Sequence, residues 1–175
     1  FYHQEFPIID YEPIKENKNR ITSFVHLLPK SEVFKTYKEM LPEYDFKAYG
    51  ASTPNNWLSK LTNIYKEMQD STFGWNIKPH GDGFGHIWHY WFMLGRPIIT
   101  NFNDYRDKLG GILFKHKETG IDLVQASMEE NVKLIKELNN VEMINNMCLN
   151  SRKAFEDNVN FDNEFVEIKK FLNRL

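Results

Sequence analysis

A glycine-rich turn, GDGFGH, lies between a candidate strand and a run of large aromatic residues. Three glycines alternate in it, at Gly81, Gly83 and Gly85. A residue without Cβ lets the backbone approach a ligand closely. The residues that follow are typical of a helix, whose first N–H groups are unpaired and whose N-terminal end carries partial positive charge. A turn of this kind is suited to bind an anion, above all a phosphate.

The same stretch holds three of the six histidines of the chain, His80, His86 and His89. On a helix His86 and His89 share a face, and two imidazoles at that spacing can bind one metal ion, with His80 or Asp82 as a third ligand. The stretch lacks the glutamate base and the supporting carboxylates of zinc hydrolases. We therefore expect no metal and histidines that bond to backbone or to a ligand oxygen; a metal-binding protein or hydrolase is the rival interpretation.

The aromatic run Trp88, Tyr90, Trp91 and Phe92 predicts a helix that is buried on both sides. Tyr90 is the member best suited to touch a ligand, because its hydroxyl needs a partner. Lys78 ends the preceding strand. It either neutralises phosphate charge or is a solvated residue at a strand end, and both interpretations stay open.

Strand and helix signals alternate around this stretch, with short connections. The predicted strands are 20–26, 44–52, 72–78, 97–100, 111–114 and 121–124. The predicted helices are 32–41 with Ser31 as N-cap, a helix capped by Asn55 or Asn56 that carries Trp57, Leu61, Ile64 and Met68, and 86–94. Alternation of this kind predicts an α/β fold of three layers, α/β/α, in which helices cover both faces of a mostly parallel sheet.

The last third of the chain turns helical from Ser127 on. Apolar residues repeat there at helical spacing in three stripes: Met128, Val132, Ile135 and Leu138; Ile144, Met147, Ser151 and Phe155; Phe165, Ile168, Leu172 and Leu175. We expect these C-terminal helices to pack as a layer with charged outer faces. The predicted organisation is one domain over 1–175, with an entry segment at 1–19, a βα core at 20–126 and the helices at 127–175.

Composition narrows the class of protein. The 175 residues suit one domain, 41% are hydrophobic, and the formal charge of −2 gives no basic surface for nucleic acid. The single cysteine, Cys148, excludes a disulfide within the chain and favours a cytoplasmic location; core packing is its expected role. We expect no membrane span and no signal sequence. The chain starts at Phe1, and its first residues are typical of a linker from an upstream segment.

The stretch DGFGHIWHYWFMLGRPIIT resembles the nucleotide-sugar-binding half of GT-B glycosyltransferases, whose pattern runs E-G-F/Y-G, a short apolar helix and G-x-P-V-I. Asp82 stands where the first family glutamate stands. The outright matches are Gly83, Phe84 and Gly85 in the turn and Gly95, Pro97, Ile98 and Ile99 in the closing strand. The resemblance rests on this motif of about twenty residues, and the order of the elements from Arg20 onward agrees with it.

This resemblance implies a Rossmann-like domain that binds a nucleotide-sugar and transfers its sugar to an unidentified acceptor. It implies a partner, the missing N-terminal Rossmann-like domain, with the chemistry in the cleft between the two. It also implies metal-independent transfer without a cofactor, because helix dipoles and basic side chains balance the leaving diphosphate. By the same resemblance, the loop after the first strand, at His26, touches the donor, and His86 faces the diphosphate.

One position departs from the family. Retaining members carry an E-x7-E pair whose second glutamate bonds the donor ribose, and the corresponding residue here is Tyr90. This departure leaves two interpretations open, an active transferase and a catalytically inactive glycosyltransferase-like interaction module.

Overall fold

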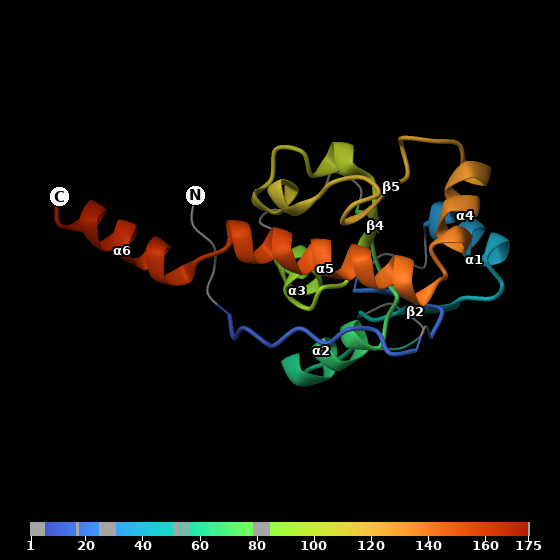
Figure 1. The fold of residues 1–175 in the computed structure, drawn as a ribbon, viewed down its shortest axis with the longest axis horizontal. Coiled ribbons are helices and arrows are strands. Elements are labelled where there is room, and N and C mark those ends of the chain that lie inside the picture. The colour runs from blue at the N-terminus through green and yellow to red at the C-terminus, as the bar shows by residue number, and fades with distance from the viewer. Residues whose placement is uncertain are drawn as a thin grey trace.

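The computed structural model describes residues 6–16, 18–24, 31–50, 53, 55, 57–78 and 85–174. In this part of the chain, five strands form one sheet in the order β2-β1-β3-β4-β5, and every neighbouring pair is parallel (Figure 1). The strands are β1 (Arg20–Ser23), β2 (Asp45–Ala48), β3 (Phe73–Asn76), β4 (Ile98–Thr100) and β5 (Gly120–Asp122). The predicted parallel sheet is confirmed, with strands shorter than the sequence pattern suggested.

Helices cover both faces of this sheet. They are α1 (Glu32–Met40), α2 (Leu61–Gln69), α3 (His86–Met93), α4 (Met128–Glu137), α5 (Val141–Asn158) and α6 (Phe161–Leu172), with two short 3₁₀ helices, η2 (Phe102–Asp104) and η3 (Leu109–Leu113). The core against one face joins α1, α4 and the first half of α5, and the core against the other joins α2, α3 and the second half of α5. The Rossmann-like three-layer α/β/α fold is therefore confirmed.

Local signals explain most helix boundaries. Ser31 caps α1 by accepting a hydrogen bond from the Phe34 amide at 3.4 Å. Ser127 and Glu130 form a reciprocal capping box at the start of α4, at 3.2 and 2.9 Å. Cys148 is fully buried in the core, as expected, and burial raises its pKa to about 11. None of the helices within the described ranges has the length and apolar character that a membrane crossing requires.

One predicted strand is wrong, and one predicted helix begins later than expected. Of the segment 111–114, residues 111–113 belong to η3 and Phe114 is its C-cap; a side chain on Gly111 would run into the Tyr105 carbonyl, so glycine permits the close packing of this turn. Helix α2 begins at Leu61, later than predicted, with Lys60 as its N-cap. The Asn55 side chain does not cap it but accepts a hydrogen bond from the Ala48 amide at 2.9 Å, and Asn56 lies outside the described residues. Trp57 consequently lies outside α2 and is 59% exposed.

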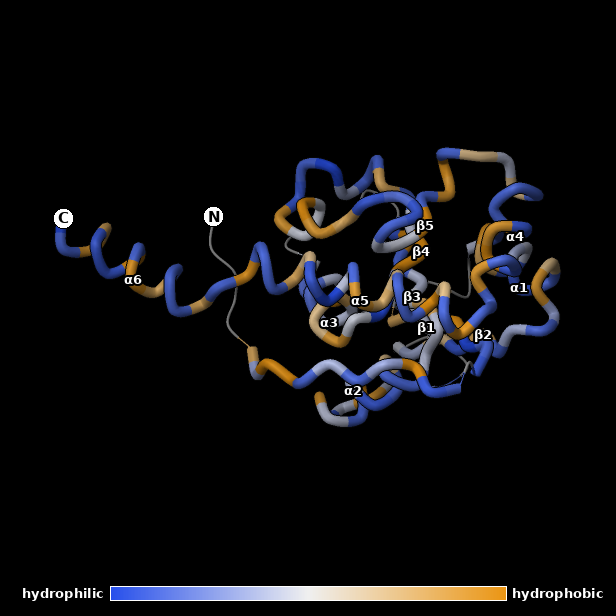
Figure 2. The backbone as a smooth tube through the Cα atoms, in the orientation of Figure 1, coloured by the Kyte–Doolittle hydropathy of each residue, from blue (hydrophilic) through white to orange (hydrophobic). Residues whose placement is uncertain are grey.

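The third C-terminal stripe also departs from expectation. Helix α6 has no buried residue, and Phe165 and Leu172 are each 58% exposed. Its first residue, Phe161, packs on Phe6 with ring centroids 5.3 Å apart, after which the helix runs away from the body of the domain (Figure 1). Figure 2 shows hydrophobic segments along this projecting helix. The sequence pattern identified its amphipathic character, whereas the expected packing against the domain is absent.

The described part of the entry segment is fastened to the domain. Residues 6–16 run in extended form across α5 and α2 (Figure 1). The Ile14 backbone exchanges two hydrogen bonds with the Asn145 side chain, both at 2.8 Å, and the Tyr11 ring covers Gly95, where a Cβ would come within 2.6 Å of Cε2. Arg96 donates to the Glu12 carbonyl at 3.0 Å. This segment, called the strap below, is an integral part of the packing.

Candidate functional site

The candidate site lies at the carboxyl edge of the sheet. The strand order reverses between β1 and β3, and ligands of open parallel sheets bind outside the carboxyl ends of strands at such a reversal. Lys78 follows β3 by two residues and is half-buried, and α3 begins at His86 directly after Gly85. Three residues that the sequence proposed, Lys78, Gly85 and His86, therefore flank the connection from β3 to α3.

Gly85 gives the start of α3 its shape. It is the N-cap, with φ 68 and ψ 42 in the left-handed region, and as glycine it offers the helix no capping side chain of its own. Its carbonyl accepts the amides of Trp88 at 2.8 Å and His89 at 3.2 Å. The left-handed conformation explains why glycine is needed at this position. A first turn whose N-cap residue has no side chain suits an anionic ligand, because such a ligand can accept hydrogen bonds from its N–H groups.

The two described histidines of the cluster have different surroundings. His86 is the half-buried first residue of α3. His89 is 1% exposed, and its Nδ1 lies 3.0 Å from the Gly85 carbonyl oxygen. Across the described ranges, no three His, Cys, Asp or Glu side chains gather in a way that could hold a metal ion. The bond from His89 to backbone fits the structural interpretation of this histidine.

Several predicted residues lie outside the described part of the chain. They are His26 in the loop after β1 and His80, Gly81, Asp82, Gly83 and Phe84 in the connection from β3 to α3. Their roles stay predictions.

The aromatic run behaves as predicted, apart from Tyr90. Trp88, Trp91 and Phe92 are fully buried. Tyr90 is half-buried between the rings of Phe6 and Tyr65, with centroids at 4.9 and 5.3 Å. Burial raises the pKa of Tyr90, so its phenol is neutral at physiological pH. It can hydrogen-bond a ligand but cannot supply the negative charge of a glutamate.

A buried polar contact at the carboxyl edge was not predicted from the sequence. The Asn76 amide, at the end of β3, donates to the Tyr105 hydroxyl at 2.8 Å, and Trp88 of α3 stacks on the Tyr105 ring at 4.3 Å. Thr100 of β4 donates to the Asn76 carbonyl at 2.8 Å. These contacts tie the first turn of α3 to the ends of two strands. The available signal was an asparagine closing the otherwise apolar strand FGWN.

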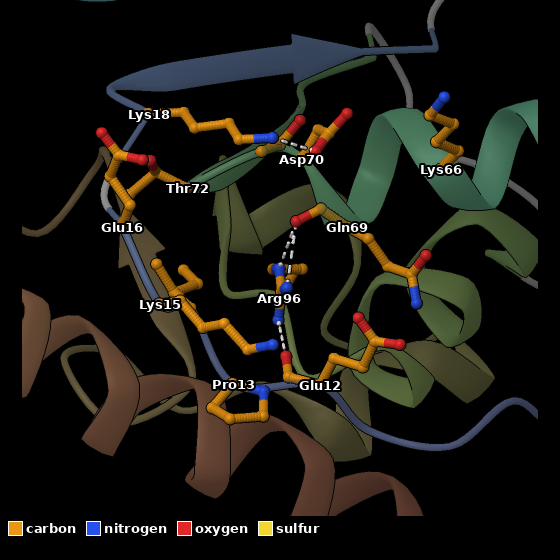
Figure 3. A pocket seen from close by; sticks show the side chains of 12 residues that line it. Glu12, Pro13, Lys15, Glu16, Lys18, Lys66, Gln69, Asp70, Thr72 and Arg96 are labelled. Carbon is orange, nitrogen blue, oxygen red and sulfur yellow. Dashed lines mark hydrogen bonds and ion pairs between the residues drawn. The ribbon is translucent and has the colours of Figure 1, made fainter.

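A cavity of about 300 Å³ lies at the opposite, amino edge of the sheet, between the strap and the end of α2 (Figure 3). Arg96, 2% exposed, lies at this cavity and donates to the carbonyls of Gln69, Glu12 and Leu94 at 3.0 to 3.2 Å. These hydrogen bonds go to backbone carbonyls, and through them Arg96 joins the strap, α2 and the start of β4. This cavity is remote from the candidate site.

A smaller cavity, of about 260 Å³, opens at the carboxyl edge between α1 and α4. Its lining is mostly apolar and includes Val33, Tyr37, Ile77, Asn101, Leu123 and Met128. Ile77 is the neighbour of Lys78 in sequence, so this cavity begins beside the candidate site.

Comparison with known proteins identifies solved structures that share this fold. No protein-family model and no curated protein sequence matches the chain. Among solved structures, TarM superposes with a TM-score of 0.70 at 11% identity, over 96% of this chain, and Anabaena HepE in complex with UDP superposes with 0.64 at 13% identity, over 91%. The C-terminal domain of the group 1 glycosyl transferase LpcC from Francisella tularensis gives 0.58 at 11% identity. The chain shares the fold of GT-B glycosyltransferases.

The extent of these matches differs between the GT-B structures. The chain spans 37% of the TarM chain and 50% of the HepE chain, but 86% of the isolated C-terminal domain of LpcC, which covers 81% of this chain. At such low identity the likeness concerns the fold, and the residues of the candidate site rest on the geometry described above.

Proposed function

We propose that the chain is the donor-binding domain of a GT-B-type glycosyltransferase and binds the diphosphate of a nucleotide-sugar at the start of α3. The observation that carries this proposal is the left-handed Gly85, an N-cap without a side chain that opens α3 at the carboxyl edge, on a fold shared with GT-B enzymes. The glycine-rich turn before it, with Asp82, completes the resemblance in sequence.

The proposed chemistry is positioning and charge stabilisation. The N–H groups of the first turn of α3 and the ammonium of Lys78 balance the charge that develops on the leaving diphosphate. His86 and Tyr90 contact the donor from the same helix, and His26 contacts it from the loop after β1. The sugar carbon then faces an acceptor across a cleft formed with a second, N-terminal Rossmann-like domain. Donor and acceptor held in this way react as neighbours, without a resident metal.

Calorimetric titration with UDP, GDP and their sugars tests the proposal. We expect one nucleotide to bind the wild-type chain and the Gly85→Val variant to lose that binding, because a β-branched residue is strained at φ 68. Gly110→Ala is the matched control, since a Cβ there meets its nearest neighbour at an ordinary 3.4 Å. A folded wild-type protein that binds none of these ligands would remove the proposal, and so would stoichiometric zinc that survives dialysis.

The position of Tyr90 keeps a second candidate open, an inactive interaction module of the same fold. A neutral phenol stands where retaining relatives carry the ribose-binding glutamate. Transfer of sugar from the nucleotide-sugar that binds, measured with the complete enzyme, separates the two. Binding of the donor without any transfer or donor hydrolysis favours the module.

A further inference from the structure

One buried hydrogen bond at the start of α3 takes no direct part in the proposed binding of the donor. The imidazole Nδ1 of His89 lies 3.0 Å from the carbonyl oxygen of Gly85, and the ring is 1% exposed. That carbonyl already accepts two backbone amides, those of Trp88 and His89. Because a carbonyl oxygen can only accept, Nδ1 must carry the proton in this contact.

Because a peptide unit is planar, this hydrogen bond also affects the direction of the next N–H group, that of His86. The carbonyl of Gly85 and the N–H of His86 belong to one planar trans peptide group and point in opposite directions. Holding the oxygen therefore fixes the direction of the His86 N–H, the first of α3. Glycine populates both signs of φ freely, so that direction depends on the three groups that bond to the Gly85 carbonyl: the amides of Trp88 and His89 and the His89 ring.

The imidazole is itself held in place. Its Cε1 lies 3.7 Å from where a Cβ would stand on Gly110, and the Phe6 ring meets it edge-on with centroids 6.5 Å apart. The adjacent Trp88 stacks on Tyr105, which accepts a hydrogen bond from Asn76 of β3. The ring that fixes Gly85 is thus supported by the strap, by η3 and, through Trp88, by the end of β3.

We propose that His89 is a positioning residue at the start of α3: its Nδ1–H holds the Gly85 carbonyl and thereby aims the His86 amide at the donor diphosphate. This inference rests on the proposed function, because it names the group that pre-organises the same site. His89 itself does not touch the donor.

Three substitutions at this position separate positioning from simple packing. His89→Asn keeps an N–H donor near the place of Nδ1, His89→Gln moves the donor toward the place of Nε2, and His89→Leu removes it. Ser127→Ala, in the α4 capping box far along the chain, is the control for general loss of stability. Each variant is compared by UDP calorimetry and by hydrogen exchange of the Trp88 and His89 amides, which bond to the same carbonyl.

We expect His89→Leu and His89→Gln to weaken UDP binding about five- to tenfold, the loss typical of one neutral hydrogen bond, and to speed exchange of the two amides. His89→Asn should stay within about twofold of wild type in both measurements, and Ser127→Ala should leave UDP affinity unchanged. An asparagine variant as impaired as the leucine variant overturns the positioning role, as does unchanged behaviour of all three. A folded wild type that binds neither UDP nor GDP overturns the proposed function itself, together with the role of His89 in binding, whatever the exchange rates show.

Discussion

Substitution of Gly74 tests how closely α3 packs against the sheet. It lies in the central strand β3, and a Cβ built on it would stand 2.6 Å from Cδ2 and 2.8 Å from Nε1 of Trp91, and closer still to Cε2. Carbon atoms in contact normally lie about 3.5 to 4.0 Å apart, so Gly74→Ala must displace the indole by about 1 Å. Trp91 is fully buried and has no room to move outward.

Overpacking of this kind costs about 1–3 kcal/mol, and we expect Gly74→Ala to cost about 2 kcal/mol, in the middle of that range. For a chain of this size, that loss corresponds to a fall in Tm of about 4–8 °C. Thermal and urea denaturation of Gly74→Ala, Trp91→Phe and the double variant measure it. If the clash is the cause, the alanine costs half as much or less when Trp91 is already phenylalanine.

The same experiment has a matched control and a clear contrary result. Gly110→Ala meets its nearest neighbour at 3.4 Å and should change the unfolding free energy by less than about 0.5 kcal/mol. A Gly74→Ala protein with the Tm of wild type, or strictly additive losses in the double variant, would show that Trp91 does not pack as described.

Four further predictions concern other parts of the domain. Arg96→Met should cost about 3 kcal/mol or more in urea denaturation, since it removes the guanidinium donors from the part-buried carbonyl of Gln69 and the buried carbonyl of Leu94; a loss below about 1 kcal/mol contradicts this. Ser127→Ala should cost about 1 kcal/mol. The hydrogen bonds with Ser127 lower the pKa of the Glu130 carboxyl. The stability that the capping box contributes is therefore present above the pKa of Glu130 in the unfolded chain and is lost as pH falls through its pKa in the folded protein. In Glu130→Gln, the free energy of unfolding should change less with pH on the acid side than it does in the wild type. Burial raises the pKa of the Cys148 thiol to about 11, so Ellman's reagent at pH 8 should react only after unfolding, and rapid reaction of native protein would contradict that burial.

Sequence periodicity predicted the elements that are defined by local pattern. The 86–94 helix, the Ser31 cap and the stripe from Ile144 to Phe155 are found where they were expected, because cap chemistry and burial period act within a few residues. Whether α6 packs on the domain depends on the surface available beyond Phe161. The pattern of Phe165 and Leu172 carries no information about that surface.

The candidate site could be predicted only as far as it depends on the topology of the sheet. Topology alone brings Lys78, Gly85 and His86 to one edge, since strands of a parallel sheet end together. Asn76 and Tyr105 are 29 residues apart, and only packing brings them into contact. The spacing of His86 and His89 suggested two metal ligands on one face, whereas the ring of His89 bonds backward to its own helix. Side chains that act through tertiary contacts are the part that periodicity does not reveal.

The exposure of Trp57 gives the molecule a built-in optical probe. Trp75, Trp88 and Trp91 are fully buried, so of the four indoles only Trp57 is open to an aqueous collisional quencher such as acrylamide. It lies in the connection between the end of β2 and the start of α2. The quenchable fraction of tryptophan emission therefore reports on the surroundings of Trp57 in this connection, without any label attached to the protein.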